Sequence, residues 1–300
     1  MAAEVITTGV VEEIRTEFGA VTHSYDGAGA RAIAIALAAE LAAFDISCPA
    51  GVVRDVTLMR ALMLPDLDDE VALAVSRVWV FAVYVDDVCA RDPAEFEAVL
   101  QAGMLPERVS VSSNARYVRH MFGELGRFCD ATFLAVYKTF FYNAMTGVLM
   151  EGEFTAEASD GIDTEFVRAR SGYCEIWSAA LQFAAPSLEI GADRRFWAAA
   201  LSRTVGFLND FNDLLSFYKE AVDGDDFLAS RIYRHAMTRG VPYLDAFRDV
   251  LVAARATHRR LRELASAEQY PYIERFMTGF VHWHFCVPRY RWQDVYPTLN

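Results

Sequence analysis

The stretch NDLLSFYKE, residues 212–220, lies in a segment that is otherwise rich in apolar side chains. Asn212, Ser216 and Glu220 recur every four residues, and each offers an oxygen atom. Because four residues advance about 40° around an α-helix and rise about 6 Å, these side chains would line one stripe. Polar side chains within an apolar surface need a partner, so the stretch predicts a buried helix that offers oxygen ligands on one face.

The neighbouring residues allow a second register, because Asn-Asp occurs both at 209–210 and at 212–213. Counting from Asn209, the positions four and eight residues on are Asp213 and Phe217, so only the register of Asn212 places an oxygen at every step. An amide oxygen, a hydroxyl and a carboxylate together suit a hard divalent cation such as Mg²⁺. The alternative interpretation is an ordinary exposed helix face.

The rest of the chain predicts an all-α fold, because no run of alternating apolar and polar residues indicates strands. Loops are expected at the Pro- and Gly-containing stretches 91–96 and 103–113. Helices that are apolar on most sides, the Ala-rich 31–45 included, predict a bundle whose inner helices are covered by outer ones. No linker divides residues 1–300, so we expect one domain. The predicted helical segments are 31–45, 66–90, 130–154, 163–183, 193–220, 243–265 and 272–286.

Composition excludes several classes of protein. The 300 residues are 54% hydrophobic and carry a net charge of −13, which argues against nucleic-acid binding because that requires a basic surface. The five cysteines are scattered and form no CxxC, as expected for reduced thiols in a cytoplasmic protein. The first residues lack the pattern of a signal peptide, and no apolar run reaches the roughly 18 residues of a membrane span.

A second acidic feature ends the predicted helix 66–90, where Asp86 and Asp87 follow apolar turns that contain Trp79 and Val83. A negative charge at a helix C-terminus is unfavourable by a few tenths to about 1 kcal/mol, so a cation is expected to offset it. The alternative is a solvated helix end. The acids at 66–70 lie at a helix start, where they serve as caps.

Several separated basic residues accompany these acids. Lys219 lies within the stripe, Arg168 lies upstream in FVRARSG, and Arg289 and Tyr290 lie near the C-terminus. In an acidic protein, a divalent-cation site together with a few basic residues suits a polyphosphate group, because no single arginine could hold and ionise a diphosphate. The combination therefore predicts a diphosphate-binding site.

Taken together, these motifs resemble those of the class I terpene synthases, and within them the trichodiene synthase group of sesquiterpene cyclases. NDLLSFYKE fits the family's metal motif N-D-x-x-S-x-x-x-E, and RARSG fits its diphosphate-sensor motif. Arg168 then takes the place of the sensor, Ser171 that of the linker, and Gly172 that of the helix break. The pair Arg289–Tyr290 fits the family's C-terminal RY. The resemblance extends from about residue 75 to the C-terminus.

One departure concerns the aspartate-rich motif. The family places a further acid four or five residues after the first Asp, but here those positions are Ala90 and Arg91. Asp92 comes six residues on, about 600° around the helix, and Pro93 moves it out of helical geometry. The resemblance therefore implies Asp86 as the metal ligand. It implies Asp87 as a supporting residue that pairs with Arg289 on closure.

The resemblance also implies a mechanism. Three Mg²⁺ ions, with Mn²⁺ as an alternative, would join the substrate diphosphate to Asp86 and to Asn212, Ser216 and Glu220. Arg168, Lys219, Arg289 and Tyr290 would donate further hydrogen bonds. The expected activity is a sesquiterpene cyclase that ionises farnesyl diphosphate and releases diphosphate. A mono- or diterpene cyclase, a prenyltransferase and a non-catalytic helical binding protein remain alternatives. The expected chain is cytoplasmic, binds neither nucleic acid nor membrane, and forms a homodimer.

An apolar cavity would have to shield the carbocation from water, and aromatic faces can stabilise it by roughly 0.5–2 kcal/mol. The candidate lining residues are Trp79, Val83, Phe141, Trp177 and Trp283. The alternative is that these aromatic side chains belong to the core. The motif HWH at 282–284 is not expected to bind a metal, because residues two apart on a helix face different directions.

Overall fold

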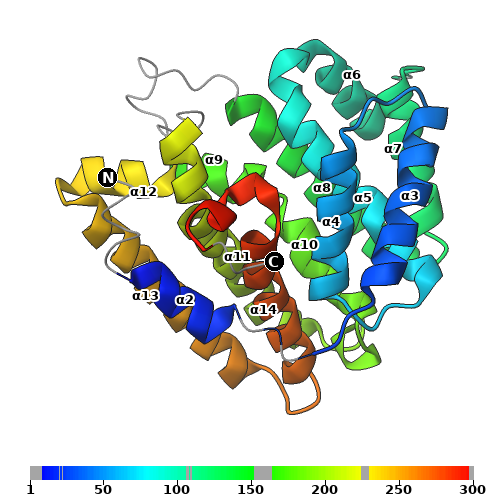
Figure 1. Cartoon of the computed structure of the whole chain (residues 1–300). Coiled ribbons are helices and arrows are strands. Elements are labelled where there is room, and N and C mark those ends of the chain that lie inside the picture. The colour runs from blue at the N-terminus through cyan, green and yellow to red at the C-terminus, as the bar shows by residue number, and fades with distance from the viewer. Residues whose placement is uncertain are drawn as a thin grey trace.

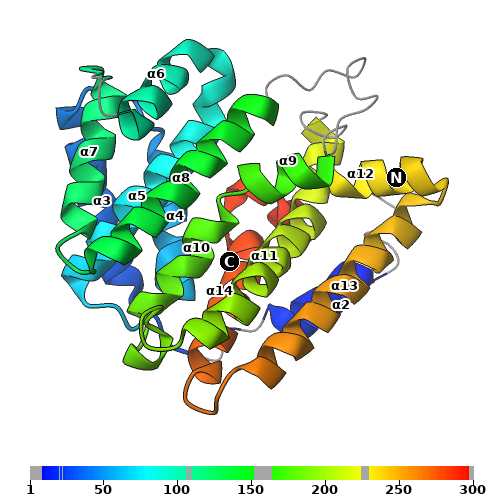
Figure 2. The ribbon, with the colours of Figure 1, turned by 180° about the vertical axis from the view of Figure 1, so that it is seen from behind.

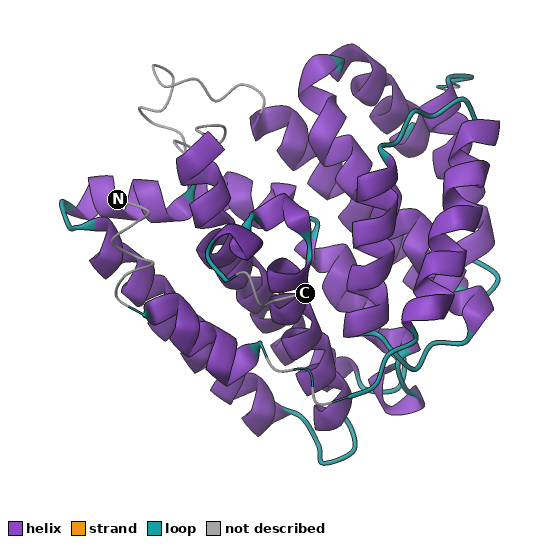
Figure 3. Ribbon diagram, viewed as in Figure 1, coloured by secondary structure: helices purple, strands orange, loops and turns teal. Residues whose placement is uncertain are grey.

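The computed structural model describes residues 9–296, apart from 20, 22, 106, 107, 109, 152–163 and 224–229, and gives the backbone alone for 164, 165, 167 and 223. No strand occurs among the described residues, which confirms the predicted all-α fold (Figure 3). The α-helices are α2 (Val10–Phe18), α3 (Gly27–Ala43), α4 (Ala50–Met63), α5 (Asp69–Val88), α6 (Pro93–Met104), α7 (Ser113–Leu125), α8 (Ala131–Glu151), α9 (Thr164–Ser171), α10 (Cys174–Ala179), α11 (Arg194–Asp223), α12 (Arg231–Arg239), α13 (Tyr243–Leu264) and α14 (Tyr270–Cys286).

The helices form an inner group with a cover on two flanks (Figures 1 and 2). Helices α4, α5, α8, α10, α11 and α14 lie at the centre. Helices α3 and α7 cover one flank, and α2, α12 and α13 cover the other. The most extensive packing joins α11 to α13, α4 to α3, α5 and α14, and α8 to α9. This arrangement matches the predicted bundle of covered inner helices.

The central packing of α4 against α14 depends on a close backbone approach. A methyl group on Gly279 of α14 would overlap the Leu62 carbonyl oxygen of α4. Glycine therefore permits the backbones of α4 and α14 to touch. Helix α14 is followed by the C-terminal 3₁₀ turn η5 (Pro288–Tyr290). That turn packs against α11, the helix that contains NDLLSFYKE.

The prediction that residues 31–45 form a buried helix was wrong. Helix α3 lies on the surface and buries one stripe, formed by Ala30, Ile33, Leu37 and Leu41, while Ile35 is 73% exposed. Alanine is a strong helix former that gains little from burial. An Ala-rich helix can therefore be stable with most of its circumference in water.

The predicted loop at 91–96 was also wrong, because Pro93 begins α6. Proline lacks an N–H, which the first helical position does not need, so it starts a helix as readily as it ends one. Helices α2, α4, α7 and α12 were not predicted either. In α2, α7 and α12 the apolar residues are interspersed with charged and polar ones. Helix α4 is mostly apolar and largely buried, and its sequence does not explain why it was missed.

Within the described residues, no helix is both long enough and apolar enough to cross a membrane.

Candidate active site

Helix α11 carries the oxygen-bearing stripe, as the sequence predicted. Ser216 is 4% exposed, and Asn212 and Glu220 are half-buried. Two oxygen atoms of this stripe, Ser216 Oγ and Glu220 Oε2, are buried and have no hydrogen-bond partner within the part of the chain that the structure describes. Burial raises the pKa of Glu220 to about 7, and Asp213 adds to this effect while the nearby Ser216 hydroxyl and Arg168 oppose it. Unpartnered buried oxygen is costly, so this face of α11 suits a cation.

The first Asn-Asp pair, Asn209–Asp210, holds neighbouring helices, and Phe217 of the alternative register packs in the core. Asn209 Oδ1 accepts a hydrogen bond of 3.1 Å from the Cys174 thiol of α10. Asp210 forms an ion pair with Arg231 of α12, and Phe217 is buried in the core. Of the two Asn-Asp pairs, the first therefore holds α10 and α12 against α11.

Arg168 of α9 joins the stripe directly. Its Nη2 lies 2.8 Å from Asp213 Oδ1, and the same nitrogen donates to Asn212 Oδ1. Burial alone would lower the pKa of Arg168, but the carboxylates of Asp213 and Glu151 raise it overall, so the side chain is a permanent cation. The structure thus brings the predicted sensor arginine next to the predicted metal motif.

The helical conformation is interrupted between α9 and α10, at Gly172 and Tyr173, where the resemblance implied a helix break. Ser171 ends α9 and donates a hydrogen bond to Glu151, the last residue of α8. A methyl group on Gly172 would lie 2.7 Å from Asn209 Oδ1, and Tyr173 adopts a left-handed φ of 52°. The break is therefore held by close packing against α11 and by a hydrogen bond to α8.

The other acidic feature lies at the end of α5. Asp86 is exposed, whereas Asp87 accepts two hydrogen bonds from Arg289, of 3.0 Å to Oδ2 and 2.7 Å to Oδ1. Asp87 and Arg289 thus lie in contact, and the formation of their pair on closure stays a prediction. Burial would lower the pKa of Arg289, but Asp87 and then Asp86 raise it overall, so the guanidinium stays charged beside the exposed carboxylate.

Asp92 has a local role, in line with its expected absence from the ligand set. The residue is exposed, lies outside α5 with φ −144° and ψ 66°, and is the N-cap of α6. Its Oδ1 accepts a hydrogen bond of 3.3 Å from the Glu95 amide. The 3₁₀ turn η1 (Cys89–Arg91) separates Asp92 from α5, and Pro93 follows Asp92 as the first residue of α6.

Tyr290 connects the two acidic features. It is 5% exposed, and its hydroxyl accepts a hydrogen bond of 3.4 Å from Asn212 Nδ2. Burial raises the pKa of Tyr290, Arg289 and Arg168 oppose this, and the carboxylates of Asp86 and Glu220 add to it. Charges from both acidic features therefore act on one buried hydroxyl.

Sequence reasoning missed His284. The two histidines of HWH face different directions, as predicted. His282 Nδ1 lies 2.7 Å from the Gly19 carbonyl oxygen, whereas His284 Nε2 lies 3.3 Å from Asn212 Nδ2. The prediction that HWH does not bind a metal assigned no other role to His284. The available signal was its position in the sequence, because His284 lies six residues before Tyr290 of the predicted C-terminal motif. Burial lowers the pKa of His284 to about 3, so the ring is neutral.

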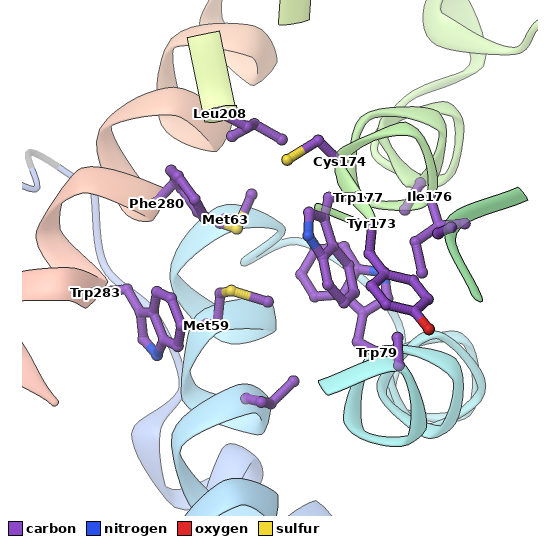
Figure 4. Close-up of a cluster of buried hydrophobic side chains, with 14 of the residues drawn as sticks. Met59, Met63, Trp79, Tyr173, Cys174, Ile176, Trp177, Leu208, Phe280 and Trp283 are labelled. Carbon is purple, nitrogen blue, oxygen red and sulfur yellow. The ribbon is translucent and has the colours of Figure 1, made fainter. Parts of the chain in front are cut away.

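Apolar side chains from several helices face one another in a buried cluster (Figure 4). The cluster adjoins the polar site through Trp283, whose ring centroid lies 5.2 Å from that of Tyr290. Trp79 and Phe141 have no exposed surface, and Trp79 Nε1 donates to Tyr137 at 3.2 Å. Trp177 packs edge-on against Trp79 at 4.9 Å, and Trp283 Nε1 donates to the Asp55 carbonyl at 2.7 Å. The labelled cluster includes Met59, Met63, Trp79, Tyr173, Cys174, Ile176, Trp177, Leu208, Phe280 and Trp283.

Core packing thus accounts for the full burial of Trp79 and Phe141, two of the five candidate cavity-lining residues. Trp177 and Trp283 keep 5% and 4% of their surface exposed, and Val83 is half-buried. Contact of all five with a substrate stays a prediction. Lys219 is half-buried on α11, one residue before Glu220, and its predicted contact with diphosphate is likewise untested.

The donor set fits Mg²⁺ or Mn²⁺ in chemistry. No three His, Cys, Asp or Glu side chains gather in a metal-binding cluster among the described residues, so the oxygens of Asn212 and Ser216 would have to complete a site with Glu220. Hard divalent cations accept amide, hydroxyl and carboxylate oxygen alike. The buried, unpartnered oxygens of Ser216 and Glu220 are the structural evidence for that site.

Solved structures with this fold are terpene synthases. A cucumene synthase variant superposes with a TM-score of 0.66 over 87% of this chain and 96% of its own, at 14% identity. Germacradien-4-ol synthase from Streptomyces citricolor superposes with a TM-score of 0.64 over 85% of this chain and 93% of its own, also at 14% identity. The fold is therefore that of the class I terpene synthases.

Residues 22–300 match the family described as trichodiene synthase (TRI5), and the chain belongs to this family. Monoterpene synthase 25 of Postia placenta is 29% identical over 104 residues, which are 34% of this chain and 31% of that protein. Trichodiene synthase of Paramyrothecium roridum is 33% identical over 88 residues, 28% of this chain and 23% of that protein. These two matches thus span less than a third of either relative.

Proposed function

We propose that this protein is a sesquiterpene cyclase that ionises farnesyl diphosphate with Mg²⁺ and cyclises the carbocation to a hydrocarbon or alcohol. One observation carries the proposal. The carboxamide of Asn212 lies between Arg168 and Tyr290, at hydrogen-bond distance from both, on the helix that presents Ser216 and Glu220. This contact supports the proposal, because the side chains that would bind metal and those that would bind diphosphate come from separate elements of the chain.

The chain's residues divide the work by chemistry. Arg168, Arg289 and Tyr290, with Lys219 beside them, would hold the diphosphate oxygens through charge-assisted hydrogen bonds. Asp87 accepts two hydrogen bonds from Arg289, and Asp86 beside it is exposed, so Asp86 would be the metal ligand at the end of α5. When bound, divalent cations supply Lewis-acid stabilisation of the negative charge that develops on the leaving group.

The apolar side chains would control the carbocation after ionisation. The cluster around Trp177 and Trp283 would exclude water from it, and the aromatic faces would stabilise positive charge. The Gly172 break would direct backbone toward the same region, because Tyr173 and Trp177 continue from it into the cluster. We propose further that residues 1–300 act as one domain, in the cytoplasm and as a homodimer.

A monoterpene cyclase is the second candidate, because one of the matched relatives is a monoterpene synthase. The test is to incubate the purified chain with Mg²⁺ and, separately, C10, C15 and C20 prenyl diphosphates, and to identify products by gas chromatography with mass spectrometry. The C15 substrate should give a cyclic product that is absent with EDTA. Cyclic products from C10 alone would establish the second candidate, and no cyclic product from any substrate would overturn the cyclase proposal.

A further inference from the structure

His284 lies completely buried on α14, in contact with three aromatic rings. The ring centroids of Tyr290, Phe280 and Trp283 lie 4.2, 4.6 and 4.8 Å from that of the imidazole. Nδ1 lies 2.9 Å from the Phe280 carbonyl oxygen one turn earlier. A carbonyl oxygen can only accept, so Nδ1 carries the proton, and Nε2 of the neutral ring presents a lone pair.

That lone pair faces Asn212. Nε2 lies 3.3 Å from Asn212 Nδ2, and the same Nδ2 lies 3.4 Å from the Tyr290 hydroxyl. On the other side of the carboxamide, Asn212 Oδ1 accepts from the Arg168 guanidinium. Turning the amide over would set its oxygen against the imidazole lone pair and its N–H groups against the arginine N–H groups. Both contacts would then be repulsive, so the surroundings select one orientation.

We propose that His284 is a positioning residue, which holds the amide nitrogen of Asn212 so that the amide oxygen is the atom offered to a divalent cation. The inference rests on the proposed function, because it concerns the same metal motif. An amide oxygen can ligate Mg²⁺ or Mn²⁺, whereas an amide N–H cannot. Residues that orient a metal ligand typically account for about 10- to 100-fold in metal affinity.

The test measures Mn²⁺ binding to the full chain by electron paramagnetic resonance in the presence of inorganic diphosphate. His284→Leu has a similar volume and no acceptor, and we expect its Mn²⁺ affinity to fall about 10- to 100-fold. His284→Phe tests the same loss with an aromatic ring should the leucine variant not fold. His284→Gln keeps an acceptor near the position of Nε2 and should recover most of the affinity.

His282→Leu is the matched control. His282 lies two residues away on α14, where it contacts the Gly19 carbonyl at 2.7 Å and Cys286 Sγ at 3.1 Å. Its loss should leave Mn²⁺ affinity unchanged. Thermal unfolding of every variant identifies those that fold normally.

An Asn212→Asp background separates positioning from packing. A carboxylate presents two oxygens, so its orientation no longer matters, and His284→Leu should cost much less Mn²⁺ affinity there than beside Asn212. An equal loss in both backgrounds, or no loss beside Asn212, would overturn the positioning role. If the unchanged protein binds no Mn²⁺ with diphosphate, the metal site of the proposed function fails and this inference fails with it.

Discussion

Arg289 and Asp87, 202 positions apart in the chain, form a two-pronged ion pair with N–O distances of 2.7 and 3.0 Å. The pair ties the C-terminal 3₁₀ turn η5 to the end of α5. Tyr290 follows Arg289 and contacts Asn212 of α11, so three distant parts of the chain converge there. Formation of this pair leaves Asp86 as the carboxylate that faces solvent at the end of α5.

Arg289→Lys should weaken both folding and diphosphate binding. Lysine cannot form the two parallel hydrogen bonds of a guanidinium, and the partners are only partly buried, so we expect a loss of about 1–2 kcal/mol in the free energy of unfolding. Urea denaturation and binding of inorganic diphosphate check this. Arg260→Lys is the control, because its pair with Glu263 is exposed and should cost less than about 0.5 kcal/mol. Equal losses for both variants would contradict the importance of the Arg289 pair.

Asp92 should matter for stability and not for turnover. Asp92→Ala removes the N-cap of α6 and should cost about 0.5–2 kcal/mol in the free energy of unfolding, while Asp92→Asn keeps a capping oxygen and should cost little. Steady-state kinetics under fully folded conditions should give wild-type turnover for both. Total loss of activity in Asp92→Asn would mean that Asp92 belongs to the metal site after all.

Gly172→Ala should impair catalysis through the helix break. The added methyl group would lie 2.7 Å from Asn209 Oδ1, and the resulting displacement of the break should lower turnover by about 10- to 100-fold. Gly206→Ala on α11 is the control, because its methyl group would meet nothing within 4 Å. We expect that variant to keep full turnover and to gain about 0.5–1 kcal/mol in stability, as alanine favours helix. Normal product formation by Gly172→Ala would show that the break tolerates a side chain.

Glu220→Gln should leave the fold intact and remove metal-dependent activity. The side chains have the same shape, but the amide lacks the charge that a divalent cation requires, and a loss of several kcal/mol in transition-state stabilisation lowers turnover on the order of 100-fold or more. Differential scanning calorimetry should show an unchanged midpoint without metal. The rise in midpoint that Mg²⁺ and diphosphate give the wild type should be absent. Retained activity would place the metal motif elsewhere.

The cysteines should be inert in the native protein. Burial raises the pKa of Cys48 and Cys174 to about 12 and that of Cys89, Cys129 and Cys286 to about 11. A raised pKa keeps each thiol protonated at pH 8, and only the thiolate reacts readily. Titration with a disulfide reagent at pH 8 should be slow in buffer and should count five thiols rapidly in urea. Fast reaction in buffer would show that at least one thiol ionises more readily than its raised pKa implies.

Dense apolar runs made most of the inner helices predictable from sequence, and α5, α8, α11 and α14 follow the expected segments, whereas α4 was missed. Helix α3 was predicted to be buried but lies on the surface, because alanine forms helix whether or not it is buried. The loop expected around Pro93 failed because proline both ends and begins helices, and the local sequence does not say which. For Trp79, a large aromatic residue suits the core and a cavity wall equally, and its hydrogen bond to Tyr137 became apparent only in the folded chain.

The sequence by itself determined the oxygen stripe of Asn212, Ser216 and Glu220, because helical periodicity alone brings residues four apart to one face. It also indicated that Asp92 lies off the face of Asp86, since six residues turn a helix by about 600° and the residue before a proline is disfavoured in helical geometry. Only the tertiary structure brings Asp87 into its ion pair with Arg289 and places His284 against Asn212. Those partners are distant in the chain, and no local rule relates them. Helix packing alone sets which side chains meet.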